Sequence, residues 1–120
     1  ECLSKMTVAE LVAKFEIICI QQDRCVELNQ TSKYNKLFKD MVQLAGVLRD
    51  HTPDQRTALI ALYKHPNPQV RLHAAAETLK INPKEARAVL QRISDRNEYP
   101  QAADARGLME GLDDGSFVPK

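Results

Sequence analysis

The sequence has no Trp, only three Tyr and three Phe, and only four Gly among its 120 residues. It contains no glycine-rich phosphate-binding loop, no G-x-S-x-G nucleophile elbow and no H-E-x-x-H zinc motif. Its three cysteines, Cys2, Cys19 and Cys25, lack C-x-x-C spacing, and none of its three histidines lies at metal-ligand spacing from a Cys or a second His. These absences predict a protein that is not an enzyme and needs no metal or cofactor.

An excess of charge of either sign is also missing. The chain carries 17 basic and 16 acidic residues, a net charge of +1, so as a whole it has no electrostatic basis for binding nucleic acid or an anionic membrane. The apolar run at residues 17–20 is far too short to span a membrane or to form a signal peptide. We therefore expect a cytoplasmic protein with reduced thiols. The sequence begins at Glu1, and Met6 follows closely. We therefore expect either that residues 1–5 are not part of the native protein or that further native sequence precedes residue 1.

The N-terminal half has the pattern of two long helices. Thr7 and Glu10 have the spacing of a capping box, and apolar residues at three- and four-residue steps predict a helix over residues 7–29. The stripe predicted to face inward is Leu11, Val12, Phe15, Ile18, Cys19, Gln22, Cys25 and Val26. Thr31 or Ser32 is the expected cap of a second helix over residues 32–50, whose apolar face is Tyr34, Leu37, Phe38, Met41, Leu44, Ala45 and Leu48. The short link between them predicts an antiparallel hairpin.

Regular helix-start signals follow residue 50. The pairs Thr52-Pro53, Asn67-Pro68 and Asn82-Pro83 each place an N-cap residue before a proline, and they lie 15 residues apart (52, 67, 82). Proline is favoured at the first helical position because its missing amide hydrogen would have no partner there. Gln55 and Glu85 lie three residues after two of the caps, which completes the capping-box motif. Helices are therefore predicted over residues 53–64, 68–81 and 83–94.

Each of these short helices has one apolar face and cannot bury that face alone. The three faces are Ala58, Leu59, Leu62 and Tyr63; Val70, Ala74, Ala75 and Leu79; and Ala86, Val89, Leu90 and Ile93. A last helix over residues 101–112 is predicted to turn inward Ala102, Ala105, Leu108, Met109 and Leu112, with Phe117 and Val118 in a tail that covers the end. The predicted fold is all-α, a single domain over residues 1–120, with a long-helix hairpin followed by short stacked helices.

Residues 65–76, HPNPQVRLHAAA, resemble a HEAT repeat, in which a turn, a Val-Arg pair and a run of small residues open a helix. Small residues let two helices approach closely, and the arginine, here Arg71, reaches along the stack to carboxylates or carbonyls of the neighbouring repeat. The resemblance implies a HEAT-like α-solenoid.

Together with residues 6–11 (MTVAEL), 33–35 (KYN) and 111–113 (GLD), the same segment resembles the family of small bacterial proteins known as domain of unknown function 2019. That family has no established enzymatic activity. Some small helical-repeat proteins of this kind look like immunity proteins, which neutralise a bacterial toxin in the cell that produces it. The resemblance thus implies a protein partner, a cognate toxin domain, whose active site this chain would occlude.

Seven residues are the candidates for binding that partner. His65, Asn67 and Arg71 lie in or beside the HEAT-like turn, where a loop-capping or interface role for His65 is favoured over acid–base chemistry. Asp104, Glu110, Asp113 and Asp114 belong to an acidic C-terminal stretch that would fit the cationic cleft of a toxin. A solvated tail is the simpler interpretation of these acidic residues.

Other side chains have simpler interpretations. His73 precedes Glu77 by four residues, which favours a surface pair, and Cys19 and Cys25 lie on the apolar stripe, which favours buried free thiols. A basic stretch remains as a possible nucleic-acid patch, although a solvated helix surface with intramolecular partners is favoured: Lys64, Arg71, Lys80, Lys84, Arg87, Arg92 and Arg96. The leading hypothesis is an immunity protein, and the alternatives are a helical-repeat scaffold or a nucleic-acid-associated regulator.

Overall fold

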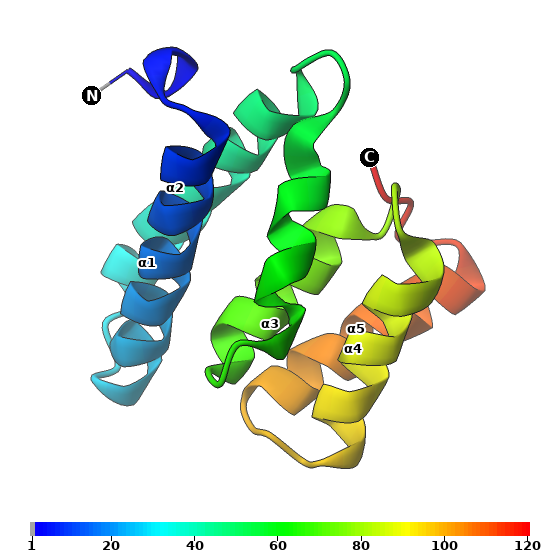
Figure 1. Cartoon of the computed structure of the whole chain (residues 1–120). Coiled ribbons are helices and arrows are strands. Elements are labelled where there is room, and N and C mark those ends of the chain that lie inside the picture. The colour runs from blue at the N-terminus through cyan, green and yellow to red at the C-terminus, as the bar shows by residue number, and fades with distance from the viewer. Residues whose placement is uncertain (1) are drawn as a thin grey trace. The chain divides into compact units, whose positions relative to one another are not determined.

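The computed structural model describes residues 2–120, and the prediction of an all-α fold is confirmed for them (Figure 1). The elements in chain order are η1 (Leu3–Lys5), α1 (Val8–Glu27), α2 (Thr31–Arg49), η2 (Gln55–Lys64), α3 (Pro68–Thr78), α4 (Pro83–Asp95) and α5 (Gln101–Asp114). The two η elements are 3₁₀ helices. No helix in the described part of the chain is long and apolar enough to cross a membrane.

The chain forms two compact units, Glu1–Leu59 and Ile60–Lys120, and η2 begins in the first and ends in the second. In the N-terminal unit α1 packs along α2, and η1 contacts α2. In the C-terminal unit α3, α4 and α5 pack against one another. The single domain over residues 1–120 stays a prediction.

The first long helix begins where its capping box predicts. Thr7 Oγ1 accepts the backbone N–H of Glu10 at 3.1 Å, and Glu10 Oε1 accepts that of Thr7 at 2.9 Å. These hydrogen bonds satisfy two amides that have no partner within the helix, and they lower the pKa of the Glu10 carboxyl. The cap predicted for the second helix is wrong: Thr31 is already helical, and Gln30 occupies the N-cap position without a side-chain hydrogen bond.

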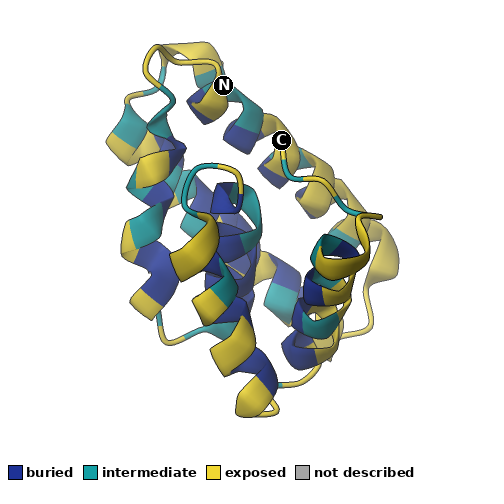
Figure 2. Ribbon diagram, turned by 90° about the vertical axis from the view of Figure 1, so that its right-hand side faces the viewer, coloured by how far each residue is buried: buried dark blue, intermediate teal, exposed yellow. Residues whose placement is uncertain are grey.

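The core of the N-terminal unit follows the predicted stripes with four exceptions. Buried in α1 are Leu11, Phe15, Ile18, Cys19, Gln22 and Cys25, and in α2 Leu37, Met41, Leu44, Ala45 and Leu48. Each helix has a buried and an exposed side (Figure 2). Four residues predicted to face inward do not belong to this core: Val26 and Phe38 are exposed, and Val12 and Tyr34 are half-buried. Cys19 and Cys25 are confirmed as buried free thiols, and the Cys19 thiol donates to Met41 Sδ at 3.9 Å.

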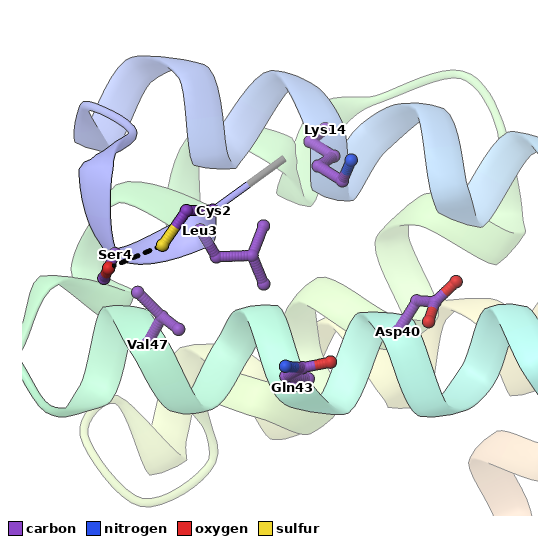
Figure 3. A pocket seen from close by; sticks show the side chains of 7 residues that line it. All are labelled: Cys2, Leu3, Ser4, Lys14, Asp40, Gln43 and Val47. Atoms are coloured by element: carbon purple, nitrogen blue, oxygen red, sulfur yellow. Dashed lines mark hydrogen bonds between the residues drawn. The ribbon is translucent and has the colours of Figure 1, made fainter.

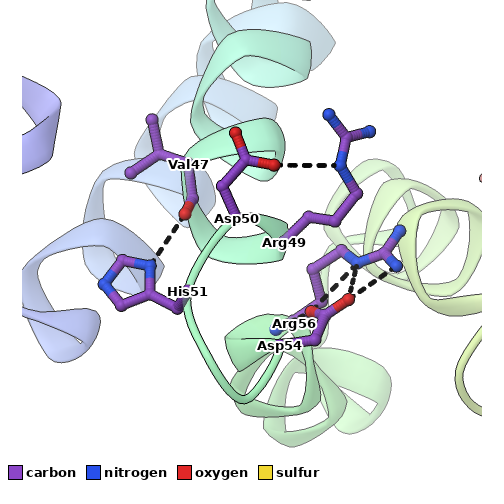
Figure 4. Close-up of polar contacts among 6 residues, drawn as sticks. All are labelled: Val47, Arg49, Asp50, His51, Asp54 and Arg56. Carbon is purple, nitrogen blue, oxygen red and sulfur yellow. Dashed lines mark hydrogen bonds and ion pairs between the residues drawn. The ribbon is translucent and has the colours of Figure 1, made fainter.

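The helix start predicted at Thr52-Pro53 is wrong. η2 begins at Gln55 and is a 3₁₀ helix, and the cap is Asp54 (Figure 4). Asp54 Oδ1 accepts the backbone N–H of Arg56 at 2.9 Å, and the two carboxylate oxygens accept its guanidinium at 2.8–3.1 Å. Gln55 forms no capping box, because its side-chain amide donates to the Pro53 carbonyl. An aspartate two residues after the threonine offers the stronger, charged acceptor for the free amides.

The N-termini of the next two helices, α3 and α4, differ in how they are capped. Asn67 caps α3 as predicted, since its Oδ1 accepts the backbone N–H of Gln69 at 2.8 Å, with Pro68 at the first helical position. Asn82 precedes α4, but its side chain makes no cap hydrogen bond. Its amide nitrogen donates to Tyr63 Oη and to Glu85 Oε2, both at 3.4 Å. The predicted capping box at Asn82 is therefore wrong, because this side chain serves a tertiary contact.

The core of the C-terminal unit is formed by the predicted small and branched residues: Leu62, Tyr63, Val70, Ala74, Ala75, Leu79, Ala86, Val89, Leu90, Ile93, Ala102, Ala105 and Met109. Leu108 and Leu112, also predicted inward, are half-buried. After α5 the chain turns at Gly115, whose φ of 82° favours glycine. Phe117 then donates its backbone N–H to the Gly111 carbonyl at 3.1 Å, so the tail folds back on the helix.

Candidate functional site

Arg71 is the most tightly held of the predicted site residues. Its Nη1 and Nη2 donate to the two carboxylate oxygens of Glu98, each at 2.8 Å. Nε donates to the His65 carbonyl at 2.7 Å, and Nη2 also reaches the Pro66 carbonyl at 3.3 Å. The same hydrogen bonds lower the pKa of the Glu98 carboxyl. Arg71 is buried and joins the turn before α3 to the turn before α5. The contact with a carboxylate that the HEAT-like pattern predicts is present at Glu98, whereas both carbonyls belong to the arginine's own segment.

His65 and Asn67 complete this corner of the C-terminal unit. The backbone N–H of Asn67 donates to His65 Nδ1 at 3.0 Å, while the Asn67 side chain caps α3. Both residues are half-buried. The predicted loop-capping role of His65 is therefore present, and the three residues of the HEAT-like segment act together to shape a turn.

His73 is buried, so the prediction that it lies on the surface is wrong. The ring is buried beside two glutamines: Gln101 Nε2 donates to Gln69 Oε1 at 2.8 Å, and Gln69 Nε2 lies 2.9 Å from His73 Nε2. An amide nitrogen is a donor only, so the ring nitrogen accepts and His73 is neutral. Burial lowers the pKa of His73 to about 4. This polar chain links α3 to α5.

The acidic candidates are separated along α5 and are partly engaged within the chain. Asp113 forms a two-pronged ion pair with Arg87 of α4, at 2.8 and 3.0 Å, which lowers the pKa of the aspartate and raises that of the arginine. Asp114 accepts the backbone N–H of Ser116 at 2.8 Å. Partial desolvation raises the pKa of Asp104, although its side chain is exposed, and Glu110 is exposed. The four residues form no continuous anionic cluster.

The N-terminal unit contains a pocket of about 570 Å³ between η1, α1 and α2 (Figure 3). Its lining is Cys2, Leu3, Ser4, Lys14, Asp40, Gln43 and Val47. The Cys2 thiol lies 3.0 Å from Ser4 Oγ, and hydrogen bonds from Ser4 lower the pKa of the thiol. His51 Nδ1 instead lies 2.8 Å from the Val47 carbonyl (Figure 4), and no histidine is among the residues that line this pocket. The pocket thus places the Cys2 thiol on the same lining as Lys14 and Asp40 and without a histidine beside it.

Exposed apolar side chains of α1 and α2 are the feature that the sequence reasoning missed. The N-terminal unit exposes Ile17, Ile20, Val26, Leu28, Phe38 and Val42, whereas the C-terminal unit exposes only Tyr99 and Val118 among its described large apolar residues. Ile17, Ile20 and Val42 fall outside the predicted stripes. That misfit to the helical period is the signal that was available in the sequence.

The sequence matches, over residues 9–113, the profile of a family described as Domain of unknown function (DUF2019). The chain belongs to the DUF2019 family. The crystal structure of the protein RPA1889 from Rhodopseudomonas palustris CGA009 is similar to this DUF2019 chain, with a TM-score of 0.96 and 43% sequence identity. The similarity covers 100% of this chain and 99% of that one. No curated protein matches this sequence.

The family predicted from the sequence segments is therefore confirmed. Within residues 2–120 no three His, Cys, Asp or Glu side chains gather in a way that could hold a metal ion. Of the seven predicted residues, the structure brings together only His65, Asn67 and Arg71. The candidate functional site is instead the exposed apolar surface of α1 and α2.

Proposed function

We propose that this DUF2019 protein is a non-enzymatic protein-binding module, and that its partner is a cognate bacterial toxin domain. The observation that carries the proposal is the unequal distribution of exposed large apolar side chains. Six of the eight such residues in the described chain lie on α1, α2 or the turn between them. Apolar side chains gathered on one part of a soluble protein are typical of protein–protein interfaces.

The proposed architecture is a HEAT-like stack. In it α1 and α2 form an antiparallel hairpin, and the shorter helices continue the series. Helical-repeat proteins use extended helix faces to bind proteins, with little change in their own structure. This architecture supports a stoichiometric inhibitor that binds beside a toxin's active site inside the producing cell and blocks access to it.

The polar residues support binding without catalysis. Arg71, Arg87 and Arg56 each form an ion pair within the chain, with Glu98, Asp113 and Asp54. Their side chains stabilise the fold, so they are poorly placed to act on a substrate. Because Arg71 and Arg87 also belong to the basic stretch, these pairs weaken the proposal of a nucleic-acid patch.

A growth-rescue experiment tests the proposal. Toxin domains from the adjacent reading frames are expressed in a susceptible bacterium with and without this protein. We expect one toxin to be neutralised and its complex with the protein to co-purify in a 1:1 ratio. The variant Phe38→Ser/Val42→Ser tests the surface, because it should fold but no longer restore growth in the presence of the toxin. The proposal would be contradicted if the protein restored growth against none of the neighbouring toxins. Salt-dependent binding of generic RNA or DNA, without binding of a toxin, would also contradict it.

A further inference from the structure

Helix α2 carries a charge excess that its own neighbours do not neutralise. It contains Lys33, Lys36, Lys39 and Arg49, and its one acidic residue is Asp40. Asp40 forms an i,i+4 pair with Lys36 at 3.5 Å. Within residues 2–120, Lys33 and Lys39 form no ion pair. Arg49 pairs with the exposed Asp50 that follows the helix, at 3.5 Å, and its charge also contributes to lowering the pKa of Asp54. Two lysines of α2 are thus without an ion-pair partner in the chain, and Arg49 has only exposed or part-exposed carboxylates near it.

Two of these cations border an apolar stripe. Residues at positions i, i+3, i+4, i+7, i+11 and i+14 share one side of a helix. On α2 this series is Asn35, Phe38, Lys39, Val42, Gly46 and Arg49. Phe38 is 42% exposed and Val42 is 45% exposed, and Lys39 and Arg49 are also exposed. We call this series the α2 stripe.

The Arg49 side chain lies over the end of the stripe. Its Nη2 is 3.6 Å from the position that a Cβ atom on Gly46 would take. The guanidinium therefore points along the stripe toward Val42, and its positive charge lies beside the apolar surface. Lys39 flanks Phe38 and Val42 near the other end. Asp40, the acidic residue of the helix, lies on another side and contributes no charge to the stripe.

We infer that the α2 stripe binds an amphipathic helix of the partner, whose apolar face covers Phe38 and Val42 and whose flanking carboxylates pair with Lys39 and Arg49. The inference rests on the proposed function, because it names the chemistry of the partner at that surface. Residues 35–49 span about 21 Å at 1.5 Å per residue, which is the length of four helical turns. An apolar centre with a charged rim is the usual arrangement of a specific interface.

The test uses two synthetic probes and the full chain. One is a helix-constrained peptide of about 15 residues with leucines at i, i+3 and i+7 and glutamates on both flanks; the other carries lysines in place of the glutamates. We expect the glutamate peptide to shift the amide NMR signals of residues 35–49 and to bind more weakly as salt is raised. The lysine peptide should bind at least about tenfold more weakly.

Charge reversal sharpens the test. The variant Lys39→Glu/Arg49→Glu should reverse the preference, so that it binds the lysine peptide and loses the glutamate peptide. The matched control Lys33→Glu/Lys36→Glu changes the net charge by the same amount on another side of the helix and should keep the original preference. Equal binding of both peptides, shifts that map elsewhere, or no binding would overturn the inference.

The two proposals fail in different ways. If the NMR shifts caused by the glutamate peptide map to the α2 stripe but the protein restores growth against no toxin, the stripe binds a helix and the immunity role is wrong. If the protein neutralises a toxin and the variant Lys39→Glu/Arg49→Glu restores growth equally well, the partner binds elsewhere and the inference is wrong. A concentration-dependent dimer that Phe38→Ser/Val42→Ser dissociates in sedimentation would show a second copy on the stripe, and it would also overturn the inference.

Discussion

The N-terminal and C-terminal units use polar and apolar residues in opposite ways. Among the polar residues that the structure describes, the N-terminal unit buries Gln22 and Arg56, whereas the C-terminal unit buries Gln69, Arg71, His73, Thr78, Ser94 and Gln101. The exposed apolar residues show the reverse distribution. Buried polar groups have to be hydrogen-bonded, so they fix the geometry of the C-terminal unit. The apolar side chains that the N-terminal unit leaves exposed are 40–59% exposed, so a large part of their apolar surface is not covered by the chain, and this is why we assign them to binding.

The largest expected effect comes from breaking the part-buried ion pair between Arg71 and Glu98. Arg71→Met leaves Glu98 and two turn carbonyls without their donor. We expect the free energy of unfolding to fall by about 3–4 kcal/mol, because three acceptors lose their hydrogen bonds and the Glu98 carboxylate is only 23% exposed. Urea denaturation measures the loss.

The matched control for this substitution is Lys36→Met in the N-terminal unit, which removes an exposed i,i+4 pair. It should change the free energy of unfolding by less than about 0.5 kcal/mol. Equal effects of the two substitutions would show that the units do not differ in their use of polar residues.

Acid should destabilise the C-terminal unit through His73. The unfolded chain binds a proton near the ordinary pKa of 6.5, but the folded chain does so only near 4. The stability is therefore complete above pH 6.5 and is lost as the pH falls toward 4, by a total of about 3 kcal/mol. His73→Gln cannot take up this proton, so its free energy of unfolding should vary much less between pH 6.5 and 4.5. Parallel pH profiles for the two proteins would contradict the burial of a neutral ring.

Two glycines of α5 give a smaller, opposed pair of effects. A Cβ on Gly111 would lie 2.8 Å from Phe117 Cβ, whereas a Cβ on Gly107 would meet nothing within 4 Å. Gly111→Ala should therefore lower the free energy of unfolding by about 1–3 kcal/mol. Gly107→Ala should raise it by about 0.5–1 kcal/mol, because alanine favours the helix. Thermal unfolding of the two variants and the parent protein measures these differences. An increase in the stability of Gly111→Ala would show that the C-terminal tail does not pack on α5.

Among the substitutions of apolar side chains, a small effect on stability is expected for the exposed residues of α2. Phe38→Ser/Val42→Ser should lower the free energy of unfolding by about 1–2 kcal/mol, since these residues are 42% and 45% exposed and only part of their apolar surface is buried. Urea denaturation of the variant checks this. A loss of several kcal/mol would mean that the two residues belong to the core, and the contrast between the units would disappear.

The helices of the chain were largely predictable because their signals are local. The Thr7 box, the Asn67-Pro68 start and the apolar periods of α4 and α5 depend on side chains within one or two turns of each other. The errors arose where a cap residue had a competing partner. Asp54 replaced Thr52 as the cap of η2, and Asn82 turned toward Tyr63, a residue 19 positions earlier in the chain.

The candidate site was less predictable, and the polar residues predicted for it were mostly misassigned, because whether a polar side chain is available for binding depends on which residues pair across the fold. Arg71 and Glu98 are 27 residues apart, and Arg87 and Asp113 are 26 apart. Before those pairs are known, such residues look like exposed binding groups. Phe38 was misassigned for a related reason: it lies at the edge of the α2 apolar face, and only the packing against α1 decides which edge is covered.

The most direct test of the binding surface is the dissociation constant of the complex with the neutralised toxin, measured by calorimetry for two variants. Phe38→Ser/Val42→Ser removes apolar contacts from the N-terminal unit, and Asp104→Asn/Glu110→Gln removes two exposed charges from α5. We predict that the first variant weakens binding at least about tenfold, whereas the second binds as the parent does. The reverse pattern, with unchanged affinity for the serine variant and a loss for the α5 variant, would contradict the assignment of the interface to the N-terminal unit.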